Sequence, residues 1–197
     1  MSAVEIQFVG LGGQGVILAG MTLGRGLALY ENLHVSLTQS FGPEARGSAC
    51  SVQLVASREP VHYPYVTQPH ILAAMSQEAY RRFVPRLRRD GLLLIEEDLV
   101  EAAAELPDGV RLYRVPATRL AEELGRRMVM NMVMVGFFTA VSDLLRPESA
   151  RRAVSESVPP GTEALNLAAF DNGFAQGQRA IRMDAGAQLA APGRGAL

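Results

Sequence analysis

The glycine-rich stretch that follows the first apolar segment constrains the fold more than any other feature of the chain. Val4–Val9 (VEIQFV) has the apolar and β-branched content of a buried strand. Gly10, Gly12 and Gly15 follow it with the spacing G-x-G-x-x-G. Because glycine has no side chain, the backbone can turn tightly here from a strand into a helix. The free N–H groups at such a helix start face any anion that approaches, so the turn is either structural or a cradle for a phosphate.

A dinucleotide site needs more than this spacing. It requires an Asp or Glu about 20 residues further on, at the end of the second strand, to bind the ribose hydroxyls. The expected second strand is Leu33–Thr38 (LHVSLT), and the residues Gln39–Phe41 that follow it include no acid. The sequence therefore disfavours a nicotinamide or flavin site, and a free-standing Rossmann-like nucleotide-binding oxidoreductase stays as the alternative interpretation.

The remaining segments alternate between short apolar strands and helices, which is typical of an α/β domain. Ala49–Ser57 follows a connection too short for a helical crossover, so we expect an antiparallel third strand. The sequence predicts one α/β domain over residues 1–182, a three-layer Rossmann-like fold with a mixed, largely parallel sheet of about six strands. A flexible tail is expected over residues 183–197. Further strands are expected at His70–Met75, Gly91–Glu96 and Val110–Val115, and helices at Val16–Tyr30, Ser76–Arg82, Ala117–Arg127, Val129–Leu145 and Glu163–Ile181.

Two absences from the composition exclude whole classes of chemistry. Cys50 is the only cysteine, so this chain cannot supply the four thiolates that hold a [4Fe–4S] cluster. All 19 basic residues are arginine, which excludes a Walker A phosphate loop and a Schiff-base lysine. Cys50 lies in an apolar segment without a histidine nearby, and we expect a buried, unreactive side chain.

Charge and hydropathy describe a neutral globular protein. With a formal net charge of −1, the chain has no electrostatic footprint for nucleic acid, and the arginine-rich run Arg81–Arg89 is expected to be a solvated face. The longest apolar run, Met128–Val141, is shorter than the ~20 residues that span a bilayer. Because a strand is expected almost at the N-terminus, without a secretory leader before it, we predict a cytoplasmic protein. The three histidines lack metal-ligand spacing, so no metal site is expected.

Several segments taken together resemble one family. They are GLGGQGV at the first turn, SFGPEARGS in the second loop, YPYVTQPHILAAMSQEAY in and after the third loop, and the later RMVMNMVMVGFF and NLAAFDNGF. This sequence is similar to the gamma subunit of the 2-oxoacid:ferredoxin oxidoreductases, most closely the 2-oxoglutarate and branched-chain members. The similarity runs from about Ile6 to Gly173. Ser48 departs from the glycine that is usual in the family, and His70 departs from its common aspartate.

The resemblance implies a non-catalytic gamma subunit of an enzyme that oxidatively decarboxylates a 2-oxoacid to an acyl-CoA, with ferredoxin as the electron acceptor. Thiamine diphosphate and [4Fe–4S] clusters would be held by alpha, beta and delta partner subunits, so this chain alone would bind no cofactor and be inactive, although coenzyme A is a possible ligand. The resemblance suggests no catalytic or metal-binding residue. Ligand contacts are expected from the first turn, at Gly10, Gly12, Gly13, Gln14 and Gly15, and from the second loop, at Gly42, Glu44, Arg46 and Gly47.

Two of these features also have simpler interpretations. Arg46 either pairs with Glu44 on the surface or reaches a phosphate or a partner carboxylate through its planar guanidinium, and the family pattern favours the second. The methionines of the segment Met128–Met134, together with Asn131, are either core or a surface for a partner chain, and we expect the surface. A pure scaffold without any ligand remains a third hypothesis for the whole chain.

Overall fold

A six-stranded mixed sheet forms the centre of the protein. The computed structural model describes residues 3–41 and 49–190. The strand order across the sheet is β2-β3-β1-β4-β5-β6, in which β2–β3 and β3–β1 pair antiparallel and the other neighbours pair parallel. The predicted α/β class and the antiparallel third strand are therefore confirmed. The strands are β1 (Val4–Leu11), β2 (His34–Ser40), β3 (Ala49–Ser57), β4 (Ile71–Ala74), β5 (Leu92–Glu96) and β6 (Arg111–Val115).

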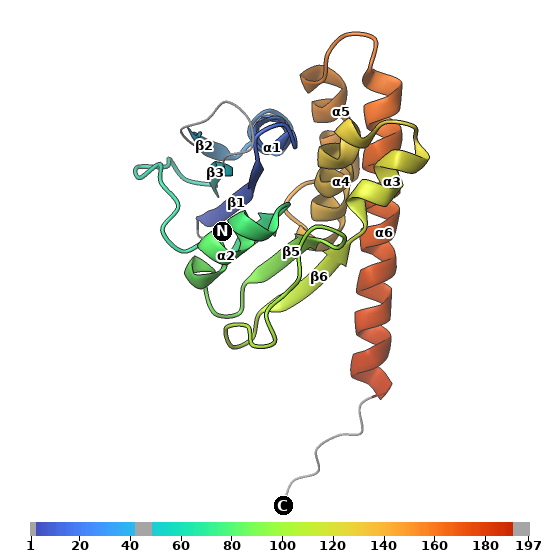
Figure 1. Cartoon of the computed structure of the whole chain (residues 1–197). Coiled ribbons are helices and arrows are strands. Elements are labelled where there is room, and N and C mark those ends of the chain that lie inside the picture. Colours follow the sequence, from blue (N-terminus) through green and yellow to red (C-terminus); the bar gives the residue numbers. More distant parts are fainter. Residues whose placement is uncertain (1–2, 42–48, 191–197) are drawn as a thin grey trace, which may run out of the picture.

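Helices cover both faces of this sheet, which gives three layers. Figure 1 shows α3, α4, α5 and α6 gathered on one side of the sheet and α2 on the other. Side chains of Ile6 and Phe8 pack into the larger core on the first side, whereas Val9 belongs to the smaller core under α2. The helical elements are α1 (Val16–Arg25), the π-helix η1 (Gly26–Tyr30), α2 (Gln77–Phe83), the 3₁₀ turn η2 (Val84–Arg86), α3 (Ala117–Glu123), the 3₁₀ turn η3 (Arg127–Val129), α4 (Met130–Ser142), α5 (Pro147–Ser157) and α6 (Glu163–Ala190).

Helix α1 lies unusually close to the sheet, and a glycine makes this possible. A Cβ on Gly20 would lie 2.3 Å from a methyl carbon of Val52 in β3, which no real side chain tolerates. Gly20 costs α1 about 1 kcal/mol of helix propensity relative to alanine. Close packing of the helix on β3 explains why glycine nevertheless stands here.

The methionine-rich segment is core, which corrects the surface that we expected. Met130, Met132 and Met134 are buried in the larger core, and Asn131 is buried with them. The reason is that α4 is enclosed on every side, between the sheet, α1 and α6. Backbone packs on backbone where α4 meets α6, because a Cβ on Gly136 would lie 2.0 Å from the carbonyl oxygen of Phe170. Of the four methionines in this segment, only Met128 is exposed.

Two helix boundaries also differ from the prediction. No helix was expected between Leu145 and Glu163, but α5 forms there with Pro147 at its start. Its buried side chains are few and small, namely Ser149, Ala150, Ala153 and Val154, so the segment has little apolar content to mark it as a core helix. Helix α6 continues to Ala190, beyond Ile181, where the expected helix ended, and into the residues assigned to the tail. The division of the chain into a domain and a flexible tail remains a prediction, since residues 191–197 lie outside the described residues.

Candidate functional site

The predicted glycine turn joins the carboxyl end of β1 to the start of α1. The amide of Gln14 donates to the carbonyl of Leu11 at 3.1 Å, which closes a tight turn over Gly12 and Gly13. Gly13 has φ +97° and Gly15 has φ +73°, values in the left-handed region that favours glycine. Gly15 is also the N-cap of α1. The glycine motif therefore forms one compact turn between β1 and α1.

Gln14 holds this turn against the sheet. Its side-chain oxygen accepts a hydrogen bond from the Leu11 amide at 2.7 Å, and its Nε2 donates to the carbonyl of Met75, just beyond β4, at 2.7 Å. Gly10 allows the arrangement, because a Cβ there would lie 2.6 Å from the Gln14 Oε1. Since both ends of the amide bond to the backbone, Gln14 positions the turn.

Asn131 at the start of α4 braces the turn from the other side. Its Nδ2 donates to the carbonyl oxygen of Gly15 at 3.3 Å, and its Oδ1 accepts from the amide of Met132 at 3.0 Å. This contact joins residues that are 116 positions apart in the chain. Asn131 therefore belongs to the candidate site, although the sequence placed it among possible partner contacts. Its only signal was its polarity within an otherwise apolar run.

An open cleft of about 230 Å³ lies beside the turn, lined by Gly13, Gln14, Arg127, Met128 and Met130. The first amides of a helix have no partner within the helix, and α1 has neither a side-chain cap nor an acid in its first turn. The partial positive charge of this helix end is therefore not neutralised locally. Arg127 forms no ion pair with any described residue. The cleft is lined by a guanidinium and lies beside a helix N-terminus, and both favour an anion.

The sheet topology argues against a dinucleotide site at this turn. In the dinucleotide-binding fold, the second strand lies parallel beside the first and carries the ribose-binding acid at its end. Here the strand beside β1 on that side is β3, which runs antiparallel, and β2 lies one position further out. β2 ends at Ser40 without an acid. The glycine spacing is therefore used in a different sheet.

The second predicted loop falls outside the described residues, and with it Gly42, Glu44, Arg46 and Gly47. The strand that follows this loop is described, and it starts beside the glycine turn. Ala49, the first residue of β3, pairs with Leu11, the last residue of β1. The glycine turn and the second loop are therefore both connected to the same end of the sheet, where β1 ends and β3 begins.

The remaining candidate residues from the sequence do not form a comparable binding site. Cys50 is buried, and burial raises the pKa of its thiol, as expected for an unreactive side chain. Burial, reinforced by Arg88, lowers the pKa of His70, whose Nδ1 accepts a hydrogen bond from the Glu5 amide at 3.1 Å. No cluster that suits a metal ion occurs among the described residues. Within the same residues, no helix is both long and apolar enough to cross a membrane.

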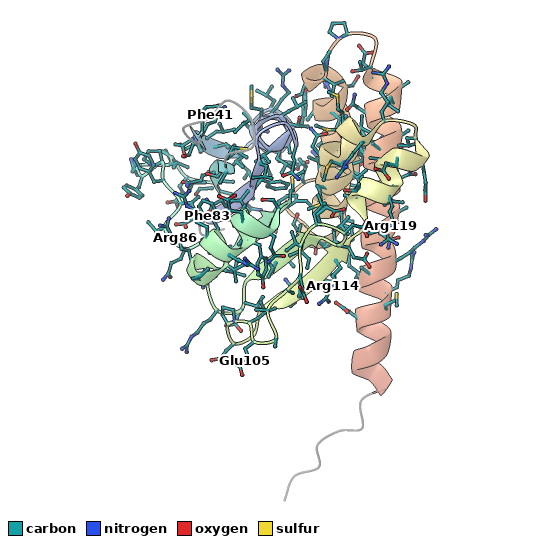
Figure 2. The ribbon with its side chains drawn as sticks, in the orientation of Figure 1. Phe41, Phe83, Arg86, Glu105, Arg114 and Arg119 are labelled. Carbon is teal, nitrogen blue, oxygen red and sulfur yellow. The ribbon has the colours of Figure 1, made fainter. Side chains whose placement is uncertain are left out.

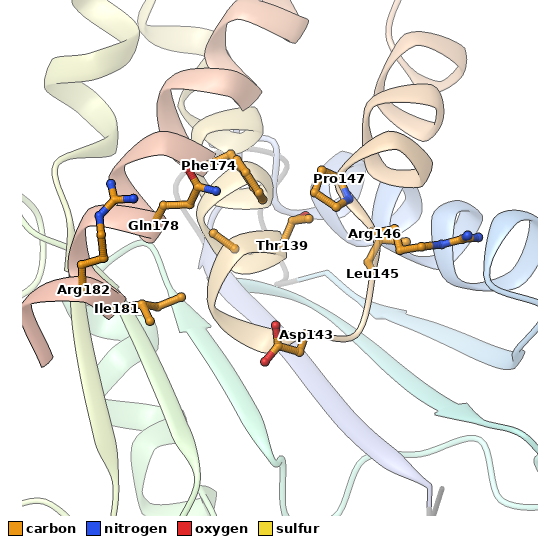
Figure 3. Close-up of a pocket in the computed structure, with 10 residues that line it drawn as sticks. Thr139, Asp143, Leu145, Arg146, Pro147, Phe174, Gln178, Ile181 and Arg182 are labelled. Atoms are coloured by element: carbon orange, nitrogen blue, oxygen red, sulfur yellow. The ribbon is translucent and has the colours of Figure 1, made fainter. Parts of the chain in front are cut away.

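A separate cavity of about 410 Å³ lies between α4, α5 and α6 (Figure 3). Its lining includes Asp143, Gln178 and Arg182, and none of the predicted site residues. Arg146, also in the lining, already pairs with Glu31 at 3.1 Å. We therefore take the glycine turn and its cleft as the candidate site.

Comparison with known proteins assigns the chain. Residues 5–176 match the family model for pyruvate ferredoxin/flavodoxin oxidoreductase. The chain belongs to this family. It is 44% identical over 171 residues to the 2-oxoglutarate synthase subunit KorC of Methanocaldococcus jannaschii, an alignment that covers 86% of this chain and 91% of that subunit. The family agrees with the resemblance that the motifs carried.

Solved structures give the same assignment. The gamma subunit of a keto/oxoacid ferredoxin oxidoreductase from Geobacter sulfurreducens superposes with a TM-score of 0.81 at 33% identity, covering 91% of this chain and 99% of that one. A 2-oxoglutarate:ferredoxin oxidoreductase from Magnetococcus marinus, solved with 2-oxoglutarate, coenzyme A and succinyl-CoA bound, shares the fold with a TM-score of 0.82. That chain is 23% identical, and the match covers 91% of this chain and 32% of that chain. The present chain is a gamma-type subunit of a 2-oxoacid:ferredoxin oxidoreductase, which sets aside the free-standing nucleotide-binding enzyme.

Proposed function

We propose that the oxidoreductase to which this chain contributes acts on 2-oxoglutarate, converting it with coenzyme A to an acyl-CoA and passing electrons to ferredoxin. The observation that carries this proposal is the match to a 2-oxoglutarate synthase subunit, which covers 91% of that subunit and 86% of this chain. The chain would work in the cytoplasm, in complex with alpha, beta and delta subunits.

The chemistry of the reaction belongs to those partners in this account. One cysteine cannot hold an iron–sulfur cluster, so we place the clusters on other subunits, and the family resemblance implies the same for thiamine diphosphate. The gamma subunit contributes a binding surface and acts as a non-catalytic subunit. Its own polar groups near the glycine turn, Gln14 and Asn131, are occupied in holding the turn in place.

We assign the cleft beside the turn to a phosphate of coenzyme A. The N-terminus of α1 supplies uncapped amides, and Arg127 supplies a guanidinium that has no ion-pair partner among the described residues. Arg46 is proposed as a second cation, because the loop that carries it leads into β3 beside Leu11. The glycines let a phosphate approach the backbone without a side chain in the way.

The test measures the KM for coenzyme A in the assembled enzyme. Arg46→Ala and Arg127→Ala should each weaken the binding of coenzyme A by about 2 to 5 kcal/mol. The larger loss is expected for the arginine that bound coenzyme A shields more completely from water. Arg46→Lys should fall between wild type and alanine, since lysine keeps the charge but loses the planar fork. Arg86→Ala is the matched control, an exposed arginine in η2 on the far side of the sheet (Figure 2).

The outcomes separate ligand binding from a pure scaffold. If the arginine variants assemble normally and turn over with the wild-type KM for coenzyme A, the glycine turn is only structural. If they fail to assemble while the control assembles, the arginines contact a partner subunit and not the substrate. The proposed contact with coenzyme A requires normal assembly and a raised KM.

A further inference from the structure

The outer strand of the sheet, β2, has an edge that no described residue protects. It pairs with β3 in an unbroken register from His34 to Ser40, so it has no bulge. Its sequence, HVSLTQS, has no proline and no Asp, Glu, Arg or Lys. No main-chain group of β2 bonds to any described residue outside β3. Soluble proteins use charges, prolines, bulges or short strands to prevent such edges from pairing with another chain. An edge strand of seven residues without these features indicates a surface that another chain covers in the functional protein.

An apolar groove runs along this edge on the side of α1. Met21 and Leu29, from α1 and η1, form one wall, and Val35 and Leu37, from β2, form the other. The groove has a volume of about 440 Å³. Leu29 is 61% exposed and Met21 is 50% exposed, which is unusual for large apolar side chains that lie close together. Phe41 follows the end of β2 and is also exposed (Figure 2).

The two faces of β2 define the chemistry of what fits against it. Val35 and Leu37 face the groove, so Ser36 and Thr38, which alternate with them, face the opposite side of the sheet. A strand added to this edge would place apolar side chains over the groove and uncharged polar side chains on the other face. Within the described residues, β2 itself has this pattern together with a free edge.

We propose that β2 pairs antiparallel with β2 of a second copy of the chain, forming a two-fold dimer with a continuous sheet. A two-fold axis perpendicular to the sheet keeps apolar faces on the same side, so Met21 and Leu29 of one copy extend the groove of the other. In such an interface the residue at the two-fold axis meets its own counterpart, and each residue on one side of the axis pairs with one on the other side, so a charge near the centre of β2 would repel its copy. β2 carries none, and the nearby Arg25 pairs with Glu156 at 3.3 Å.

The experiment measures the dimer of the full-length chain by sedimentation equilibrium over a concentration series. The wild type should show a reversible monomer–dimer equilibrium. Leu29→Arg and Met21→Glu each bury a charge in the interface and should weaken the dimer by at least about tenfold. Both side chains are at least half exposed in the monomer, so the variants should fold. Met183→Arg, at a side chain 75% exposed on α6, is the matched control and should dimerise as the wild type does.

Hydrogen–deuterium exchange locates the interface in the same samples. Dimerisation should slow the exchange of amides in β2, and this protection should be lost in Leu29→Arg. A chain that stays monomeric at every concentration overturns the proposal. So does a dimer that both charge variants leave intact, because its interface then lies elsewhere. Protection of β2 that appears only when other subunits of the oxidoreductase are added shows that the edge receives a partner subunit, and this too overturns the dimer.

Discussion

Replacing Gly15 by alanine tests how the candidate site is built. Gly15 has φ +73°, and an L-residue held in the left-handed region costs roughly 1 to 2 kcal/mol. The new methyl carbon would also lie 2.5 Å from Nδ2 of Asn131, so Asn131 must move and its hydrogen bond to the Gly15 carbonyl weakens. Losing that bond and crowding the site add about 1 to 3 kcal/mol. We therefore expect Gly15→Ala to lower the free energy of unfolding by about 2 to 5 kcal/mol.

Gly13→Ala is the matched control for this change. Gly13 also has a positive φ, +97°, but nothing lies within 4 Å of a Cβ built on it. Only the backbone penalty of about 1 to 2 kcal/mol should remain. Urea unfolding followed by far-UV circular dichroism gives both values, and Asn131→Ala in the Gly15→Ala background should recover part of the loss. Equal losses for the two glycine variants would refute the contact between Asn131 and the turn.

Two further predictions concern groups away from the turn. Burial, with Arg88, lowers the pKa of His70 in the folded chain, so the unfolded chain binds more protons as the pH falls below the ordinary histidine value of 6.5. The urea midpoint should therefore decrease as the pH falls through this value, and His70→Gln should reduce that decrease; an unchanged slope would contradict the assignment. Glu96 is fully buried, with Oε1 accepting from the Thr118 amide at 2.9 Å and Oε2 from the Leu99 amide at 2.7 Å. Glu96→Ala leaves the buried Thr118 amide without a partner and leaves the Leu99 amide only its longer bond to the backbone carbonyl of residue 96, at 3.4 Å, so it should cost about 2 to 4 kcal/mol in urea unfolding, whereas a cost below about 1 kcal/mol would mean that water replaces the carboxylate.

The first strand, the turn and the antiparallel third strand were predictable because their causes are local. Val4–Val9 shows the apolar content of a strand, and the glycines mark the turn after it. The connection before Ala49 is too short for a parallel crossover, which decides the direction of β3. The missing acid after β2 was also a local signal, and the topology gives its reason: β2 does not lie beside β1.

The contacts that complete the site were not predictable, because they join distant parts of the chain. Asn131 braces Gly15 only because α4 packs beside α1, and no local pattern specifies that packing. The burial of Met132 has the same origin, since a helix that is apolar all round is core when other helices enclose it and surface when they do not. Helix α5 was missed because the segment is polar overall and its buried face consists of small residues such as Ala150 and Ala153, so no run of large apolar side chains marks it.

The most direct measurement for the whole account is purification of this chain, tagged, from its native cells, followed by an assay of the eluate. We expect it to bring down thiamine-diphosphate and iron–sulfur subunits, and the eluate to reduce ferredoxin only when both 2-oxoglutarate and coenzyme A are present. The chain purified alone should be colourless and inactive, since its single cysteine cannot hold a cluster. A tagged chain that elutes without any subunit of an oxidoreductase, or a complex that oxidises other 2-oxoacids but not 2-oxoglutarate, would contradict the proposed function.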